Sequence, residues 1–206
     1  AKPYFVDIDP SSGNIDVSKI ESCINDKTKV IAPIDYTGRP ADLFEIKEIA
    51  DKHNLVVVED ACQALGAELK GKRVGSISHL TVFSFHPVKS ITTCEGGAIV
   101  TDNKDYYDKM KSFISHGIIK NNFINKSHGD WYFEMTNLGQ NSRLSELQSA
   151  LGISQLNKLD NFLFKRRAIA GRYHEAFGGC DFIERPLIDS DGLKSSWHLY
   201  VIRLNS

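Results

Sequence analysis

The sequence predicts an α/β fold with a mostly parallel sheet. Extended and helical patterns alternate over the first hundred residues, which is the rhythm of βαβ units. The run Val56 to Val58 is apolar throughout, as in a strand that is covered on both faces. Charged residues make up 25% of the 206 residues and the formal net charge is −1, a composition typical of a globular protein.

The elements of the sheet follow in chain order from these patterns. Apolar spacing and β-branched runs predict helices over residues 16–24, 42–53 and 103–116, and strands over 29–34, 55–59, 80–85 and 97–101. Asp42 and Glu45 are expected to form a capping box at the start of the second helix. The apolar face of that helix is expected to pack on the sheet by Leu43, Ile46, Ile49 and Ala50.

The second half of the chain holds an irregular segment and a long helical pattern. Residues 118–137 lack periodicity and are rich in Asn, Gly, His and aromatic residues, as in a functional surface loop. Leucines at helical spacing over 145–177 predict one long or once-broken helix. We therefore expect residues 1–157 to form a large domain, and 158–206 to hold a linking helix and the start of a small α+β domain.

The two ends of the chain suggest that it is part of a longer protein. It begins at Ala1 rather than Met, and it stops two residues after the β-like run 197–204. That run would need strand partners that the chain does not obviously provide. We therefore expect a fragment, and we expect part of any phosphate site to lie outside it.

Charge and cysteine patterns narrow the possible functions. Lys and Arg number 25 against 26 Asp and Glu, without a basic stripe, so we expect no nucleic-acid partner. Apolar runs fall far short of the roughly 20 residues of a membrane span, and we see no signal-peptide pattern, so we expect a cytoplasmic protein. We expect neither a disulfide framework nor a metal site, because the cysteines lack CxxC spacing: Cys23, Cys62, Cys94 and Cys180.

Polar side chains gather where two of the predicted strands end. Asp60 follows one strand, and Ser84, His86 and Lys89 follow another. Ligands of open α/β sheets bind at the carboxyl ends of strands. An aspartate, a lysine and a hydroxyl in such positions suit pyridoxal 5'-phosphate (PLP), whose aldehyde bonds a lysine amine and whose pyridine nitrogen pairs with a carboxylate. From spacing alone, a turn-capping Asp60 and an exposed loop Lys89 remain alternative interpretations.

Four motifs carry a resemblance to a known family. They lie in a constant order at residues 58–67 (VEDACQALGA), 84–89 (SFHPVK), 95–97 (EGG) and 138–144 (LGQNSRL). Together they resemble the DegT/DnrJ/StrS family of PLP-dependent nucleotide-sugar aminotransferases, and the resemblance covers essentially the whole chain. It implies the PLP-dependent transferase fold of type I, with an aspartate-aminotransferase-like large domain.

The resemblance assigns roles to individual residues. It makes Lys89 the Schiff-base lysine and proton carrier, and Asp60 the partner of the pyridine nitrogen. It implies that Gln63 contacts the ring hydroxyl of the cofactor and that Ser84 contacts its phosphate. It also implies a homodimer whose active sites cross the interface, with Asn141 reaching the phosphate bound by the partner subunit.

Other candidates have two interpretations each. Arg143 either faces the anionic region near Asn141 or forms a structural salt bridge, and His86 either stacks near the cofactor or fills the strand exit. We keep both as substrate-binding candidates. The aromatic residues at 131–133 are expected to cover a nucleotide base or to anchor their loop, and the basic run 165–167 to form a solvated helix face.

The resemblance implies a reaction. Glutamate donates an amino group, leaving as 2-oxoglutarate, to the 4-keto carbon of a UDP-linked 4-keto-6-deoxy-N-acetylhexosamine in the biosynthesis of a surface or flagellar amino sugar. Two alternatives stay open: a PLP-dependent sugar dehydratase of the same family, and a non-catalytic homologue. Lys89 argues against the dehydratases that carry His at this position, and the intact set of cofactor-binding residues argues against a non-catalytic protein.

Overall fold

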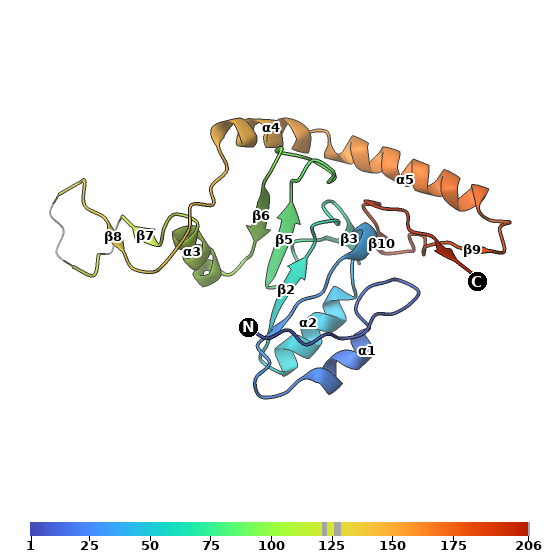
Figure 1. Cartoon of the computed structure of the whole chain (residues 1–206), viewed down its shortest axis with the longest axis horizontal. Coiled ribbons are helices and arrows are strands. Elements are labelled where there is room, and N and C mark those ends of the chain that lie inside the picture. The colour runs from blue at the N-terminus through green and yellow to red at the C-terminus, as the bar shows by residue number, and fades with distance from the viewer. Residues whose placement is uncertain (121–122, 126–128, 206) are drawn as a thin grey trace.

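The computed structural model describes residues 1–120, 123–125 and 129–205. A four-stranded sheet of order β1-β2-β5-β6 lies at its centre (Figure 1). The strands β1, β2 and β5 are parallel, and β6 runs antiparallel to β5. The predicted α/β fold with a mainly parallel sheet is therefore confirmed. The bounds of these strands are Val30–Ile31 (β1), Val56–Asp60 (β2), Leu80–Ser84 (β5) and Gly97–Val100 (β6).

The strand β2 is central, and its burial alternates along the strand. Val57 and Glu59 point to the same face and are fully buried, as the two-residue period of a strand requires. Its register with β5 pairs Asp60 with Val82, so β5 continues two residues past the end of β2. The carboxyl ends of both strands therefore lie at one edge of the sheet.

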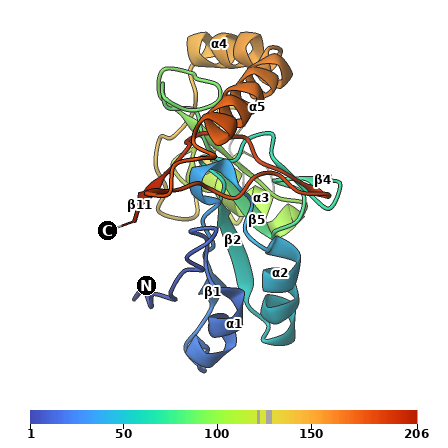
Figure 2. The same ribbon diagram turned by 90° about the vertical axis from the view of Figure 1, so that its right-hand side faces the viewer.

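The first two helices lie at the end of the sheet opposite to the carboxyl ends of β2 and β5. Figure 2 shows α1 (Val17–Ile20) and α2 (Leu43–Lys52) at one end of the sheet. At the other end lie α4 (Glu146–Leu156) and α5 (Leu159–Ala176). The predicted apolar face of α2 is confirmed: Leu43, Ile46 and Ala50 are fully buried in the main core, and Ile49 packs against it. A short 3-10 helix, Glu21–Cys23 (η1), follows α1.

The predicted capping box at the start of α2 is wrong. Asp42 precedes the helix, but its side chain makes no capping hydrogen bond. Its ψ of 63° lies outside the extended conformation that aims a capping side chain at the first turn. A capping box forms instead at the start of α4, where Ser145 and Gln148 bond to each other's backbone N–H groups.

The helix α3 (Lys104–Phe113) confirms the helix expected over 103–116. Asn103 caps it by accepting from two backbone N–H groups of the first turn. The following segment is more ordered than we predicted, because Ile118–Ile119 (β7) pairs with Glu134–Met135 (β8). These two strands form an arm that projects away from the sheet in Figure 1.

The long helical pattern is a once-broken helix, as expected. Its two parts are Glu146–Leu156 (α4) and Leu159–Ala176 (α5). From α5, Leu159 and Leu163 pack with Ile91 in a second small core, which also touches Leu65 and Phe85. Because Ile91 lies in the loop between β5 and β6, this contact packs α5 against that loop.

The last segment folds back on the sheet-forming part of the chain. Leu193–Lys194 (β10) pairs with Glu68–Leu69 (β3), which pairs with Lys72–Arg73 (β4). Ile183–Glu184 (β9) pairs with Arg203–Leu204 (β11), and a 3-10 turn at Tyr36–Gly38 (η2) lies under residues 196–199.

The strand expected over 197–204 is wrong except for its last two residues. Trp197 has a φ of 51°, which breaks an extended run. The backbone N–H groups of Ser196 and His198 bond to carbonyls of η2 rather than to a neighbouring strand. The boundary at 157/158 between two domains stays a prediction.

Candidate functional site

The carboxyl end of β2 holds Asp60 in a defined position. Its backbone N–H donates to Pro33 O at 2.9 Å, and its carbonyl accepts from Asp35 N at 3.0 Å. The half-buried side chain accepts from Cys62 N through Oδ1 at 3.0 Å. Asp60 is therefore a fixed carboxylate at the sheet edge where ligands of α/β proteins bind.

Lys89 lies in the loop between β5 and β6. The loop is closed at its base by Phe85, whose N–H donates to Gly96 O at 2.8 Å and whose carbonyl accepts from Thr93 N at 3.0 Å. Lys89 N donates to His86 O at 3.0 Å, so a turn directly after the strand presents the lysine. Its side chain is half-buried.

The charges of Asp60 and Lys89 both act on the Cys62 thiol. The pKa of the Cys62 thiol is raised to about 11, mainly by burial and then by Asp60, while the charge of Lys89 opposes the rise. Both charges therefore act on one side chain. Asp60 and Lys89, which are 29 positions apart in the sequence, follow the neighbouring parallel strands β2 and β5, and their action in one site stays a prediction.

Gln63 is oriented by the turn η2. Its Oε1 accepts from Thr37 N at 2.8 Å, and its backbone carbonyl accepts from Ser196 Oγ at 2.6 Å. Because a backbone N–H can only donate, the amide oxygen must face Thr37 and the NH2 group must face away from it. Gln63 therefore offers two donor hydrogens at the site.

Ser84 ends β5 beside Gly97 of β6. Its Oγ accepts from His86 N at 3.3 Å, which leaves the hydroxyl hydrogen free to donate. His86 is exposed at the strand exit, and its Nε2 lies 3.9 Å from Glu95 Oε1. Its role toward substrate stays a prediction.

Asn141 and Arg143 make no bond to the other predicted site residues within the part of the chain that the structure describes. Both are exposed, and Asn141 forms a β-bridge with Ser115 after α3. Within the described ranges, no hydrogen bond or ion pair connects either residue to Asp60 or Lys89, and Arg143 makes no salt bridge. Their contribution to the site of a partner subunit stays a prediction.

Two buried carboxylates beside Asp60 had no signal in the sequence. Asp35 and Glu59 are both fully buried. Asp35 Oδ1 accepts from Ala41 N at 2.9 Å, and Glu59 Oε2 accepts from Thr81 Oγ1 at 2.7 Å. Burial raises the pKa of Asp35 well above its usual value, and the charge of Glu59 raises it further. Asp35 therefore holds its proton to a higher pH than an ordinary aspartate does.

His198 is a further residue that sequence reasoning missed. Burial lowers the pKa of its imidazole, and the charges of Lys89 and Arg166 lower it further, so the ring is neutral near pH 7. Its Nδ1 is buried and makes no hydrogen bond within the part of the chain that the structure describes. The residue lies near Lys89 only because the last segment folds back.

The basic run 165–167 forms the expected solvated face at Lys165, which is exposed, but Arg166 and Arg167 are half-buried. Arg166 Nη1 donates to Trp197 O at 3.2 Å and to His198 O at 3.3 Å. Arg167 Nε donates to Ser195 O at 3.1 Å. The returning segment covers this side of α5, so the two arginines bind backbone carbonyls instead of water.

The aromatic residues of the arm partly anchor it. The ring of Tyr132 meets that of Phe123 edge-on at 5.1 Å, and its hydroxyl donates to Glu134 Oε1 at 2.9 Å. Trp131 and Phe133 are 72% and 56% exposed, so they pack little within this chain. Tyr132 therefore supports the anchoring interpretation, and cover of a nucleotide base stays a prediction.

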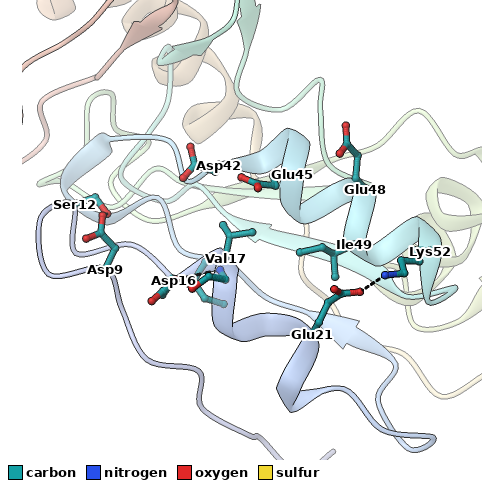
Figure 3. Close-up of a pocket in the computed structure, with 12 residues that line it drawn as sticks. Asp9, Ser12, Asp16, Val17, Glu21, Asp42, Glu45, Glu48, Ile49 and Lys52 are labelled. Carbon is teal, nitrogen blue, oxygen red and sulfur yellow. Dashed lines mark hydrogen bonds and ion pairs between the residues drawn. The ribbon is translucent and has the colours of Figure 1, made fainter.

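A separate acidic pocket lies between α1 and α2 (Figure 3). Its volume is about 610 Å³, and Glu21 in its wall pairs with Lys52 at 2.7 Å. None of the predicted site residues lines it. Among the described residues, no group of three or more His, Cys, Asp or Glu side chains could hold a metal ion, and no helix is long and apolar enough to cross a membrane.

The chemistry of the donor set fits PLP. The edge of the sheet presents a carboxylate (Asp60), an amine (Lys89), an amide with two donor hydrogens (Gln63) and a hydroxyl with a free hydrogen (Ser84). A pyridine nitrogen, an aldehyde, a ring oxygen and a phosphate are the groups that such donors and acceptors bind.

Comparison with known proteins identifies a family. The model of the DegT/DnrJ/EryC1/StrS aminotransferase family matches residues 1–206. A similar protein is the UDP-4-amino-4,6-dideoxy-N-acetyl-beta-L-altrosamine transaminase of Campylobacter jejuni. It is 44% identical over 207 residues, which cover 99% of this chain and 53% of the relative.

Solved structures agree. PseC of Helicobacter pylori, an aminotransferase involved in the biosynthesis of pseudoaminic acid, is 39% identical with a TM-score of 0.88 and covers 99% of this chain and 53% of its own. The PLP form of a putative sugar aminotransferase from Streptococcus pneumoniae is 28% identical with a TM-score of 0.86 and covers 99% and 55%. This chain spans about half the length of the relatives that it matches.

Proposed function

Because the chain belongs to the DegT/DnrJ/EryC1/StrS aminotransferase family, we propose that the protein containing it is a PLP-dependent nucleotide-sugar aminotransferase. Its fold is that of the PLP-dependent aminotransferases, the PLP-dependent transferase fold of type I. The observation that carries the proposal is that Asp60 and Lys89 follow the neighbouring parallel strands β2 and β5 at one edge of the sheet, with Gln63 three residues after β2.

The residues of this chain divide the work of holding the cofactor. When bound, PLP supplies an aldehyde that bonds amines and a ring that takes up electrons. Lys89 provides an amine and carries a proton at Nζ, and Asp60 holds a proton at the pyridine nitrogen. Gln63 donates from Nε2 to the ring oxygen, and Ser84 donates from Oγ to the phosphate.

The proposed substrates are inferred from the names of the relatives. The similar Campylobacter protein is named as a transaminase of a UDP-linked 4-amino-4,6-dideoxy-N-acetyl sugar. We therefore propose that the acceptor is the 4-keto carbon of a UDP-linked 4-keto-6-deoxy-N-acetylhexosamine and that glutamate is the donor. Arg143 and His86 are the proposed substrate contacts.

The proposed assembly is a cytoplasmic homodimer. The exposure of Asn141 and Arg143 supports a site completed by the partner subunit. In this arrangement, Asn141 of one protomer binds the phosphate held by the other. Analytical ultracentrifugation of the whole protein tests the dimer, and a PLP-loaded, active monomer would contradict it.

The first test is an absorbance spectrum of the whole protein with PLP, recorded before and after glutamate and then after a UDP-4-keto sugar. We expect glutamate to remove the band of the bound cofactor and the sugar to restore it. A band that glutamate leaves unchanged would favour the dehydratase branch or another donor, and no band would favour a non-catalytic homologue.

Lys89→Ala is the matched variant for this spectrum. Because Lys89 is half-buried in a surface loop, we expect the variant to fold like the wild type while losing turnover. Circular dichroism checks the fold, and the amino transfer rate checks the role. Comparable turnover in the variant would remove Lys89 from the mechanism.

A further inference from the structure

Residues 195–199 form a returning segment that packs against the backbone of Gln63. Ser196 in this segment is fully buried and far from Gln63 in sequence. Its Oγ lies 2.6 Å from Gln63 O and 3.3 Å from Gly38 O, and its N–H donates to Gly38 O at 2.9 Å. Since a hydroxyl has one hydrogen, the shorter contact takes it, and Ser196 donates to Gln63.

The contact between Ser196 and Gln63 leaves no room for a side chain at Gly38. Gly38 has a φ of 97°, and a Cβ added to it would lie 2.3 Å from Ser196 Oγ and 2.7 Å from Gln63 O. Glycine at this position therefore allows the returning segment to reach the backbone of Gln63. The three residues form one close-packed junction.

The same segment also holds the turn that orients the Gln63 side chain. His198 N and Leu199 N donate to Thr37 O at 2.9 and 3.2 Å. Thr37 N in turn donates to Gln63 Oε1, and the φ of 62° at Thr37 is a conformation that non-glycine residues rarely adopt without support. The segment thus fixes Gln63 at its backbone and at its amide.

The helix α5 holds the segment from the other side. Arg166 binds the carbonyls of Trp197 and His198, and Arg167 binds that of Ser195. Residues 195–198 therefore lie between α5 and η2. Within the described residues, the Nε2 of Gln63 makes no hydrogen bond, so this clamped amide keeps its donor hydrogens for a ligand.

We propose that Ser196 is a positioning residue of the cofactor site, which fixes Gln63 so that its Nε2 is the donor presented to the ring oxygen of PLP. Ser196 itself does not touch the cofactor. The inference rests on the proposed function, in which Gln63 binds that oxygen. It assigns the returning segment a role in cofactor binding beyond closing the fold.

Ser195 provides a matched control. It is the adjacent serine and is 2% exposed, but its buried Oγ makes no hydrogen bond within the described ranges. Ser195→Ala and Ser196→Ala therefore delete the same atom from the same segment, and only the second removes a bond to Gln63. The experiment titrates each apo variant of the whole protein with PLP and follows the absorbance of the bound cofactor.

We expect Ser196→Ala to weaken PLP binding about fivefold, the usual worth of one hydrogen bond, and Ser195→Ala to stay within about twofold of the wild type. We also expect the absorbance maximum of the bound cofactor to shift only in Ser196→Ala, because the donor at the ring oxygen is displaced. Equal affinities and equal spectra for the two variants would overturn the proposal.

A double-mutant cycle separates positioning from a structural effect. In a Gln63→Ala background the amide is gone, so Ser196→Ala should cause no further loss of PLP affinity. The same fivefold loss in both backgrounds would show that Ser196 acts on the fold alone and would overturn the proposal. If Ser196→Ala does not fold, Ser196→Cys replaces the hydroxyl by a weaker donor of similar size. It should weaken PLP binding when Gln63 is present and have no effect in the Gln63→Ala background, and an equal loss in both backgrounds would overturn the proposal.

Failure of the proposed function has a different signature. If the wild type shows no saturable, phosphate-dependent binding of PLP, both the function and this inference fall. If the wild type binds PLP and Ser196→Ala binds it equally well with the same spectrum, only the positioning role falls.

Discussion

The buried carboxyl pair beside Asp60 predicts an unusual pH dependence of stability. Asp35 and Glu59 are fully buried, and one oxygen of each, Asp35 Oδ2 and Glu59 Oε1, makes no hydrogen bond within the described part of the chain. Burial and then the charge of Glu59 raise the pKa of Asp35 well above its usual value. The native state therefore binds a proton that the unfolded state releases near pH 4.

The sign and size of the effect follow from linkage. Between the unfolded pKa of Asp35 and its raised native pKa, the native state binds more protons, so the free energy of unfolding falls as pH rises. One whole proton corresponds to about 1.4 kcal/mol per pH unit. The loss begins near pH 4 and levels off above the native pKa of Asp35.

The substitution Asp35→Asn removes this titration while keeping the shape of the side chain. Its Oδ1 still accepts from Ala41 N, and its NH2 group replaces the carboxyl proton. The free energy of unfolding of the wild type and of the variant is measured with urea on the whole protein from pH 5 to pH 8. We expect the difference, wild type minus variant, to fall by up to about 1.4 kcal/mol per pH unit.

Asp42→Asn is the matched control, because Asp42 is exposed and its side chain makes no capping hydrogen bond. Its stability should run parallel to that of the wild type over the same pH range. A constant difference between wild type and Asp35→Asn would refute the reasoning, since it would mean that Asp35 is ionised throughout.

Three further predictions concern packing and reactivity. Leu163→Ala should cost about 2 to 5 kcal/mol in unfolding, since Leu163 is 2% exposed in the small core under α5, whereas Phe164→Ala, at 71% exposed, should change unfolding little. Gly97→Ala should lower the melting temperature, because the new Cβ would lie 2.6 Å from a backbone carbonyl oxygen of β5; an unchanged melting temperature would count against the close β5 and β6 pairing. Iodoacetamide at pH 8 should modify exposed Cys94 well before Cys62, because a pKa of about 11 leaves only about one Cys62 side chain in a thousand as thiolate. Mass spectrometry of tryptic peptides gives the order of modification, and faster labelling of Cys62 would contradict its burial.

Local patterns were enough to predict most of the elements. The strand at Val56 to Val58, the apolar face of α2 and the broken helix over 145–177 were all predicted correctly, because strand and helix periods act over a few residues. The predictions for Asp42 and for residues 197–204 failed for a related reason. Asp42 has a ψ of 63° and Trp197 a φ of 51°, and the neighbours of Trp197 bond to η2, so neither segment follows its local pattern.

The sequence by itself determined which polar side chains follow the ends of β2 and β5. Asp60 and Lys89 each follow a strand, and parallel neighbouring strands bring their carboxyl ends to one edge, so chain order alone predicts their meeting. The family motifs added roles for Gln63 and Ser84. The positions of Asp60 and Lys89 follow from the two-residue period of the strands and from the order of the strands in the chain.

Only the tertiary structure decided what surrounds these residues. Ser196 is separated from Gln63 by 133 positions, and His198 reaches Lys89 by the same return of the chain. Burial raises the pKa of Asp35, and the charge of Glu59 in β2 raises it further. Burial and long-range contacts set the charge of a carboxyl and the orientation of an amide, and neither leaves a periodic signal in the sequence.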